Sequence, residues 1–214
     1  RIDLMQLHCP PTEVYYRPEL FYLFDELVKE GKVRSYGVSV EKVEEALKAI
    51  EYEGVSTVQI IFNMFRQRPS ELFFREAKAK NVGIIARVPL ASGLLTGKFD
   101  AESVFDKEDH RFFNREGAAF DKGETFSGVD YSNGIEAVAK LKQLFNDNAN
   151  LPQKALRWIL DFEEVSCIIP GASSVNQLLS NLHASEMKSL SQGETNQVNA
   201  LYNTAIKNAV HHLW

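Results

Sequence analysis

Short apolar runs alternate with amphipathic segments along most of the chain. Residues 1–8 form the first apolar run, and residues 18–30 follow with apolar side chains at helical spacing. The apolar face of this predicted helix consists of Leu20, Leu23, Phe24, Leu27 and Val28. Because the strand-then-helix order repeats, the pattern predicts an α/β protein.

The remaining elements follow the same rhythm. Further strands are predicted at 33–39, 56–63, 83–90 and 165–172. Helices are predicted at 41–54, 70–83, 133–147, 152–163 and 175–184. Ser70 is placed to cap one helix, and Ser191 has capping-box spacing with Glu194 at the start of a last one. Helices between strands require parallel pairing with crossover connections.

Two architectures contain such strands, the doubly wound sheet and the (β/α)8 barrel. No G-x-G-x-x-G motif follows any strand, so the phosphate loop of dinucleotide-binding doubly wound sheets is missing. Polar residues also recur at the carboxyl ends of the strands, where barrel enzymes place their chemistry. The sequence therefore favours a TIM barrel in one domain over residues 1–214. The five predicted strands make it a partial barrel, because closure needs eight.

The polar strand ends each allow two interpretations. His8 is followed by Cys9 and two prolines, and is either a catalytic group at a strand mouth or a capping side chain. Ser39 either caps the next helix or belongs to a site. Gln59 needs buried partners, from a ligand amide or from a side-chain network. Arg87 needs a carboxylate or a flat ring to lie against.

Two longer segments are also candidates for part of a functional site. The strand at 165–172 leads through a Gly-Ala-Ser-Ser turn into a helix, whose free first amides form an anion site or are simply capped by serine. Residues 99–132 are polar and lack clear periodicity. Such a stretch is typical of a lid or binding loop over the barrel mouth, with disorder as the alternative.

Composition narrows the classes of protein. The chain has 214 residues, 44% of them hydrophobic and 25% charged, with a net charge of −5. An acidic chain without a basic run argues against nucleic acid or membrane as partners, and we expect a cytoplasmic protein. Cys9 and Cys167 lack metal-ligand spacing, so we expect reduced, buried thiols and no metal site.

Five ordered motifs resemble those of the aldo-keto reductases along nearly the whole chain. They are IDLMQLHCP, LVKEGKVRSYGVS, VQIIFNMF, IIARVPLASGLLTGKF and CIIPGASSVNQLLSNL. The resemblance implies a (β/α)8 barrel that binds NADPH across its carboxyl-terminal mouth. It also implies an oxidoreductase that reduces a small-molecule aldehyde or ketone to an alcohol by hydride transfer.

The resemblance assigns roles residue by residue. His8 matches the active-site histidine that orients the carbonyl, and Ser39 and Gln59 match the residues that hold the nicotinamide carboxamide. Arg87 stands where many members stack a tyrosine on the nicotinamide ring. The loop around the pyrophosphate is matched by Pro89, Leu90, Ser92, Gly93, Leu94 and Lys98. The segment at the adenosine end is matched by Gly171, Ala172, Ser173, Gln177 and Asn181.

Three departures from the family pattern carry consequences. Val40 replaces a usual asparagine, which removes one expected hydrogen bond to the carboxamide. Ser173 and Ser174 stand where a basic residue commonly holds the 2′-phosphate, so NADH stays open beside NADPH. The motif with His8 belongs to the family's fourth strand, which implies strands four to eight here. The proton-donating tyrosine and its partner aspartate and lysine match nothing in residues 1–214, so we expect no reductase activity from this chain alone.

Other classes of protein stay open at this point. A non-catalytic relative that binds the nicotinamide cofactor, as a sensor or channel-associated subunit, would carry the same motifs. A barrel isomerase or aldolase that binds phosphate would also use a serine-bearing helix start. A half-barrel that assembles with a partner, or a homo-oligomer, is a further alternative.

Overall fold

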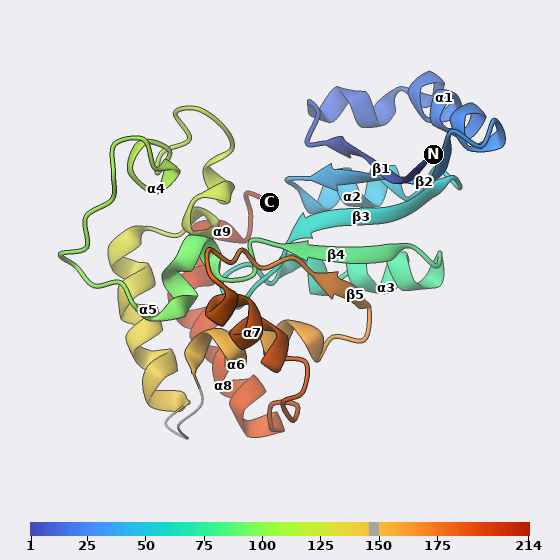
Figure 1. Ribbon diagram of the computed structural model, residues 1–214. Helices are drawn as coiled ribbons and strands as arrows, with labels where there is room; N and C mark the ends of the chain where they lie inside the picture. The colour runs from blue at the N-terminus through green and yellow to red at the C-terminus, as the bar shows by residue number, and fades with distance from the viewer. Residues whose placement is uncertain (146–149) are drawn as a thin grey trace.

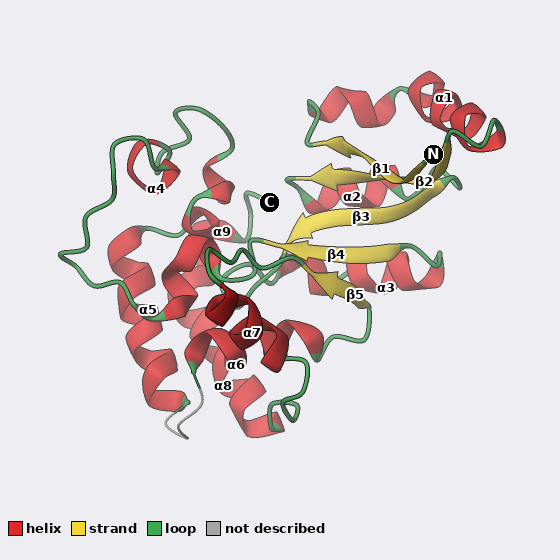
Figure 2. Ribbon diagram, viewed as in Figure 1, coloured by secondary structure: helices red, strands yellow, loops and turns green. Residues whose placement is uncertain are grey.

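A computed structural model describes residues 1–145 and 150–214. In sequence order, its strands are β1 (Ile2–His8), β2 (Val33–Val40), β3 (Val55–Ile61), β4 (Gly83–Arg87) and β5 (Val165–Ile168). They form one sheet in the order β1-β2-β3-β4-β5, and all neighbours are parallel (Figure 2). The parallel α/β prediction is confirmed.

Helices cover one face of the sheet. They are α1 (Pro18–Lys29), α2 (Val43–Ala49) and α3 (Phe73–Ala79), each following a strand (Figure 1). Val38, Val58 and Ile84 lie side by side in register on this face and are fully buried. Because side chains alternate between faces, the polar residues next to them along the strands point to the opposite face.

The second half of the chain packs beside the sheet. Its helices are α4 (His110–Phe113), α5 (Tyr131–Leu144), α6 (Leu151–Leu160), α7 (Val175–His183), α8 (Gln192–Leu201) and α9 (Lys207–Val210). An aromatic cluster joins this half to the sheet: Phe62 follows β3 and its ring lies 4.7 Å from Phe74 and 5.1 Å from Trp158. The apolar core therefore continues from the sheet into the helices.

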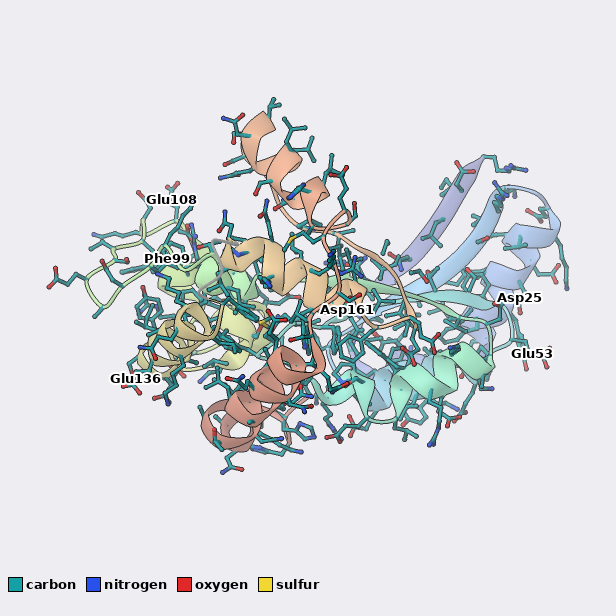
Figure 3. The ribbon with its side chains drawn as sticks, turned by 90° about the horizontal axis from the view of Figure 1, so that it is seen from below. Asp25, Glu53, Phe99, Glu108, Glu136 and Asp161 are labelled. Carbon is teal, nitrogen blue, oxygen red and sulfur yellow. The ribbon has the colours of Figure 1, made fainter. Side chains whose placement is uncertain are left out.

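Short helical turns connect these elements. The 3-10 turns are Thr12–Tyr16, Arg68–Ser70, Ala91–Thr96, Lys122–Glu124 and Phe126–Gly128, and a π-helical turn spans Tyr202–Ile206. In Figure 3, Phe99 and Glu108 of the long segment lie at the opposite end of the molecule from Asp25 and Glu53.

Several sequence predictions of detail were wrong. Ser70 does not cap α3, because its hydroxyl donates to the carbonyl of Gln67 within a 3-10 turn and the helix begins at Phe73. Leu23 is 56% exposed, and Phe21 takes its expected place in the core. Cys167 is exposed, although both thiols are free as expected.

The ends of several elements also differ from prediction. The fifth strand stops at Ile168, two residues before Pro170, which has no amide hydrogen for a ladder. The helix predicted over 133–147 is observed as Tyr131–Leu144, and residues 146 and 147 lie outside the described residues. By contrast, the capping box of Ser191 and Glu194 is confirmed.

Both edges of the sheet leave apolar side chains exposed. On β1, Ile2 is 52% exposed and Leu4 38%, on the same face as His8. After β5, helix α7 exposes Val175, Leu178, Leu179 and Leu182. Within the described residues, no helix combines the length and apolarity that crossing a membrane requires.

Candidate functional site

Three predicted site residues form a row across neighbouring strands. His8 pairs in register with Ser39, and Ser39 pairs with Gln59, so the three side chains share the face that α1–α3 leave uncovered. Ser39 is buried and its hydroxyl lies 3.4 Å from the Cys9 sulfur, whereas His8 is exposed. Parallel register thus brings together residues that lie 51 positions apart in the chain.

Gln59 belongs to a side-chain network on this face. Its Nε2 donates to Gln6 Oε1 at 2.9 Å, and Gln6 Nε2 donates to Thr57 Oγ1 at 3.2 Å. The network alternative raised from the sequence is therefore what the structure contains. Ser39 does not cap α2, whose N-cap residue is Lys42.

Arg87 connects three segments at the ends of the strands. It is the last residue of β4, and its Nη2 lies 3.0 Å from Glu41 Oε2 and donates to the Val40 carbonyl at 3.0 Å. Its Nη1 forms an ion pair with Glu124 of the long segment. Of the two partners considered from sequence, the carboxylate is the one observed.

A first cavity of about 580 Å³ lies beside the end of β4. The predicted residues that line it are Pro89, Leu90, Ser92, Gly93, Lys98, Gly171, Gln177 and Asn181. The structure thus brings together residues of two motifs, although Lys98 and Gly171 lie 73 positions apart in the chain. The long segment contributes His110, Arg111, Phe120 and Glu124 to the same wall.

Three of the residues predicted to hold the pyrophosphate or the adenosine do not line this cavity. Leu94 is fully buried in the apolar core. Ala172 and Ser173 are exposed beside the cavity, and the Ser173 amide and hydroxyl both donate to Gln177 Oε1, at 2.7 and 2.9 Å. Ser174 caps α7 by accepting from the Gln177 amide. The serine-cap alternative is therefore realised at this helix.

A second cavity of about 710 Å³ contains His8 and Arg87. The other residues that line it are Cys9, Glu41, Val88, Phe120, Asp121 and Glu124. Three residues, Val88, Phe120 and Glu124, line both cavities. The two cavities are therefore neighbours that share one wall.

The backbone between the cavities adopts an unusual conformation. Val88, Ala91 and Ser92 have φ values of 50°, 48° and 54°, in the left-handed region that non-glycine residues seldom occupy. Ser92 is fixed by two hydrogen bonds, because its hydroxyl donates to the Glu124 carbonyl at 2.9 Å and accepts from the Phe126 amide at 3.1 Å. Strained backbone of this kind is concentrated at functional sites.

The long segment is anchored to the strand ends rather than free. Asn63 is fully buried and its Nδ2 donates to the Val88 carbonyl and to Ser127 Oγ, both at 2.8 Å. Trp214 Nε1 donates to Asp121 at 2.8 Å, and Arg66 stacks 3.9 Å from the Trp214 ring. These contacts place residues 120–127 over the sheet end.

Burial changes the proton affinity of two groups in the second cavity. It raises the pKa of the Glu41 carboxyl to about 7, against the opposing effect of Arg87. Burial also raises the pKa of the Cys9 thiol to about 11, against the effects of Ser39 and Arg87. Cys9 is therefore a neutral thiol near pH 7 and a poor nucleophile.

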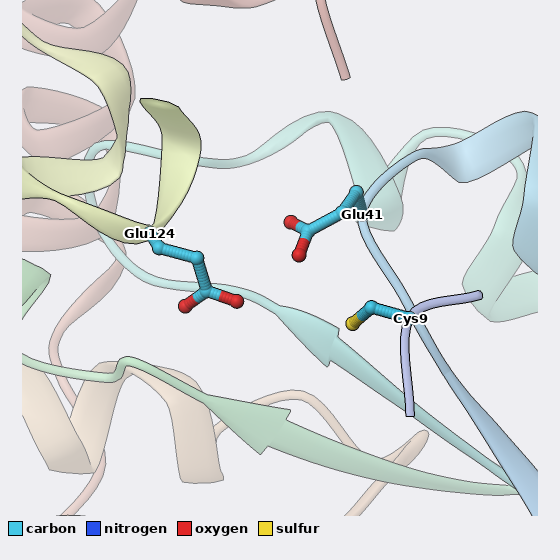
Figure 4. A group of neighbouring side chains, drawn as sticks. All are labelled: Cys9, Glu41 and Glu124. Carbon is cyan, nitrogen blue, oxygen red and sulfur yellow. The ribbon is translucent and has the colours of Figure 1, made fainter. Parts of the chain in front are cut away.

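Cys9, Glu41 and Glu124 point toward a common space from three segments (Figure 4). Their possible ligand atoms lie within 4.8 Å of one another. Metal binding requires a thiolate, and the Arg87 guanidinium already pairs with both carboxylates. We therefore assign no metal to this group.

Sequence reasoning missed most of the second cavity. Glu41 directly follows β2, so its position at a strand end was an available signal. Asp121 and Glu124 lie in the long segment, where no pattern distinguishes a cavity residue from an exposed one. The approach of that segment to Arg87 depends on the tertiary fold, which local sequence patterns do not predict.

Comparisons with known proteins agree with this geometry. The sequence profile of the Aldo/keto reductase family matches residues 1–203. The chain is 26% identical to the Uncharacterized oxidoreductase YqkF of Bacillus subtilis, over 90% of this chain and 58% of that protein. It is 28% identical to the Aldo-keto reductase yakc [NADP(+)] of Schizosaccharomyces pombe, over 87% of this chain and 53% of that protein.

A solved structure shares the fold of this chain. The glycerol dehydrogenase AKR11B4 from Gluconobacter oxydans superposes with a TM-score of 0.72 and 25% identity, covering 96% of this chain and 59% of that one. The chain thus spans 53–59% of the length of these three proteins. Sheet and matches define an α/β chain with a partial barrel fold. The chain belongs to the aldo/keto reductase family.

Proposed function

We propose that this chain supplies the cofactor cradle and the carbonyl-orienting histidine of an NADP-dependent aldo-keto reductase that reduces an aldehyde or ketone. The observation that carries the proposal is the pair of neighbouring cavities, one lined by the predicted pyrophosphate and adenosine residues, the other by His8. In this proposal the five strands correspond to strands four to eight of the family barrel.

The residues that line the first cavity support a dinucleotide as its ligand. Lys98 lines it without an ion pair among the described residues, so its ammonium group is available to a phosphate. A Cβ at Gly93 would lie 2.9 Å from the Phe99 ring, so the close approach of the backbone requires glycine. Gln177 and Asn181 of α7 supply amides at the other end of the cavity.

The strand ends would hold the reacting end of the cofactor. Bound NADPH would supply the hydride. Ser39 and Gln59 lie in register beside His8, and although neither lines a cavity in this structure, their hydroxyl and amide would hold the carboxamide. The His8 imidazole would donate a hydrogen bond to the substrate carbonyl oxygen and so fix its orientation. Arg87 would present the flat guanidinium that Glu41 and Glu124 hold in place.

A titration with NADPH tests the cradle. We expect NADPH to quench the fluorescence of the chain's tryptophans and to bind about tenfold more weakly to Lys98→Gln, because one phosphate contact is lost. Lys107→Gln is the matched control, since Lys107 is exposed on the long segment that follows Lys98 and lines neither cavity. Equal affinity of the two variants would remove Lys98 from the site, and no binding by any of the proteins would refute the proposal.

In this proposal, residues 1–214 do not include the side chain that donates a proton to the carbonyl oxygen. Within the described residues, neither cavity is lined by a tyrosine. We expect residues 1–214 to bind NADPH but to give no measurable NADPH-dependent reduction of an aldehyde, measured by absorbance at the nicotinamide band. Turnover comparable to that of a full-length relative would contradict this expectation.

The absence of a lining tyrosine also fits a second candidate function. A cofactor-binding sensor or channel-associated subunit needs the first cavity but no proton donor. The protein purified from its own source distinguishes the two: NADPH binding with aldehyde turnover identifies the reductase, and binding without turnover identifies the subunit.

A further inference from the structure

The two neighbouring cavities differ in charge. The second cavity is lined by three carboxylates, those of Glu41, Asp121 and Glu124, and by the single guanidinium of Arg87. When all are ionised, this wall carries two negative charges in excess. The cavity also contains the Phe120 ring, whose face attracts cations.

The first cavity has the opposite balance. Lys98 and Arg111 face the single carboxylate of Glu124 there, which leaves one positive charge in excess. Arg111 is held by Asp109, whereas Lys98 has no such partner among the described residues. The shared wall thus separates a cavity with one uncompensated ammonium group, that of Lys98, from a cavity with an excess of carboxylates.

The carboxylates of the acidic cavity are fixed by the fold. Asp121 Oδ1 accepts hydrogen bonds from the Gly123 amide at 2.7 Å and from Trp214 Nε1 at 2.8 Å. Glu124 is held by Arg87, and its carbonyl accepts from the Ser92 hydroxyl. Because these carboxylates are held in place, their charges act on any ligand that enters the second cavity.

The wall also has polar atoms with unmet hydrogen bonds. Arg87 is only 6% exposed, and its Nε has no hydrogen-bond partner. Glu41 Oε2 is buried and also lacks a hydrogen bond, because the Arg87 Nη2 at 3.0 Å is an ion-pair neighbour without hydrogen-bond alignment. Each of these buried groups needs a partner, which a ligand, an ion or a water would supply.

We infer that the second cavity selects carbonyl compounds by charge, preferring one that bears a quaternary ammonium group over a neutral isostere and disfavouring one that bears a carboxylate. The inference rests on the proposed function, because His8 in the same wall is what makes this cavity the carbonyl site. It adds Glu41, Asp121 and Glu124 as specificity-determining residues.

The alcohol products of carbonyl reduction are suitable probes because they form no imines with lysine. Choline and 3,3-dimethylbutan-1-ol have the same shape and differ in one positive charge, and 4-hydroxybutanoate carries a negative charge. Titration calorimetry at pH 8, with the chain saturated with NADP⁺, measures the three dissociation constants. We expect choline to bind at least about tenfold more tightly than its isostere, and 4-hydroxybutanoate more weakly than both.

Two variants assign the effect to the cavity. Asp121→Asn keeps the Oδ1 acceptor and Glu41→Gln keeps the shape, and each should reduce the preference for choline by about threefold or more. Glu116→Gln is the matched control, since Glu116 lies on the same segment with a side chain 84% exposed. Raising the salt concentration should shrink the preference in the unmodified chain.

The outcomes separate the two proposals. If NADP⁺ binds but choline and its isostere bind equally, or 4-hydroxybutanoate binds most tightly, the charge selection is wrong and the cofactor site stands. The same conclusion follows if Glu116→Gln lowers the preference as much as Asp121→Asn. If NADP⁺ does not bind, the proposed function and the inference fall together.

Discussion

At the scale of single residues, the site depends on a charged cluster built around one arginine. Arg87 neutralises one of the two glutamates that contact it, so Glu41 and Glu124 share a single compensating charge. Breaking a buried pair by removing one partner is costly, because the remaining charge stays buried. Burial of Glu41, with a further contribution from the Glu124 carboxylate, raises its pKa in spite of the opposing effect of Arg87.

The raised pKa of Glu41 makes stability depend on pH. Its pKa is about 7 in the folded chain and 4.5 ordinarily, so the folded state holds its proton more tightly and stability falls as pH rises through this window. We expect the free energy of unfolding to drop by up to about 3 kcal/mol between pH 5 and 8 from this group. Arg87, Glu124 and Asp121 are the charged groups that act on it.

Urea unfolding at pH 5 and pH 8 measures this effect. Glu41→Gln should remove most of the loss, because glutamine does not titrate, and the exposed Glu116→Gln should retain it. A loss of equal size in Glu41→Gln and the unmodified chain would show that other groups cause it.

At the scale of elements, the turn after β4 carries the most demanding backbone. Gly93 has a φ of 96° and the Phe99 ring occupies the space that a Cβ would need. Gly171, at the far side of the first cavity, has no atom within 4 Å of such a Cβ. The two glycines of one cavity therefore have different tolerances.

Alanine substitution should separate these two glycines. Gly93→Ala should lower the free energy of unfolding by about 1–3 kcal/mol, because the left-handed conformation and the contact with Phe99 are both unfavourable for alanine. Gly171→Ala should be within about 0.5 kcal/mol of the unmodified chain. Thermal unfolding followed by circular dichroism measures both, and equal losses would contradict the assigned roles.

Sequence patterning predicted the elements well where packing and local signals agree. Apolar runs and helical spacing located every strand of the described sheet, and the Ser191 cap was found because its signal is local. The cap predicted at Ser70 was wrong: serine is a common helix cap, but here the chain forms a 3-10 turn before the helix begins. The row of His8, Ser39 and Gln59 followed from parallel pairing, whereas the approach of Glu124 to Arg87 required the folded long segment.

At the scale of the whole molecule, the sheet has two unpaired edges with apolar neighbours. β1 and β5 each pair on one side only, and exposed apolar residues accompany both. Unpaired edges and apolar patches promote association between chains. An oligomeric state stays a prediction from these features.

Self-association should therefore respond to a charge on α7. We expect the sedimentation coefficient of the unmodified chain to rise with concentration and that of Leu179→Lys to rise less, because Leu179 is 58% exposed in the apolar row of that helix. Leu72→Lys, at an exposed leucine ahead of α3, is the control and should behave like the unmodified chain. Identical behaviour of all three would show that α7 does not mediate association.

The wall shared by the two cavities has a thermodynamic consequence. Glu124 lines both cavities, so a ligand that displaces its carboxylate in one cavity changes the wall that a ligand contacts in the other. Linkage requires that such an influence be reciprocal and equal in free energy. If a ligand in the first cavity lowers the dissociation constant of a ligand in the second, then the second ligand must lower the dissociation constant of the first by the same factor.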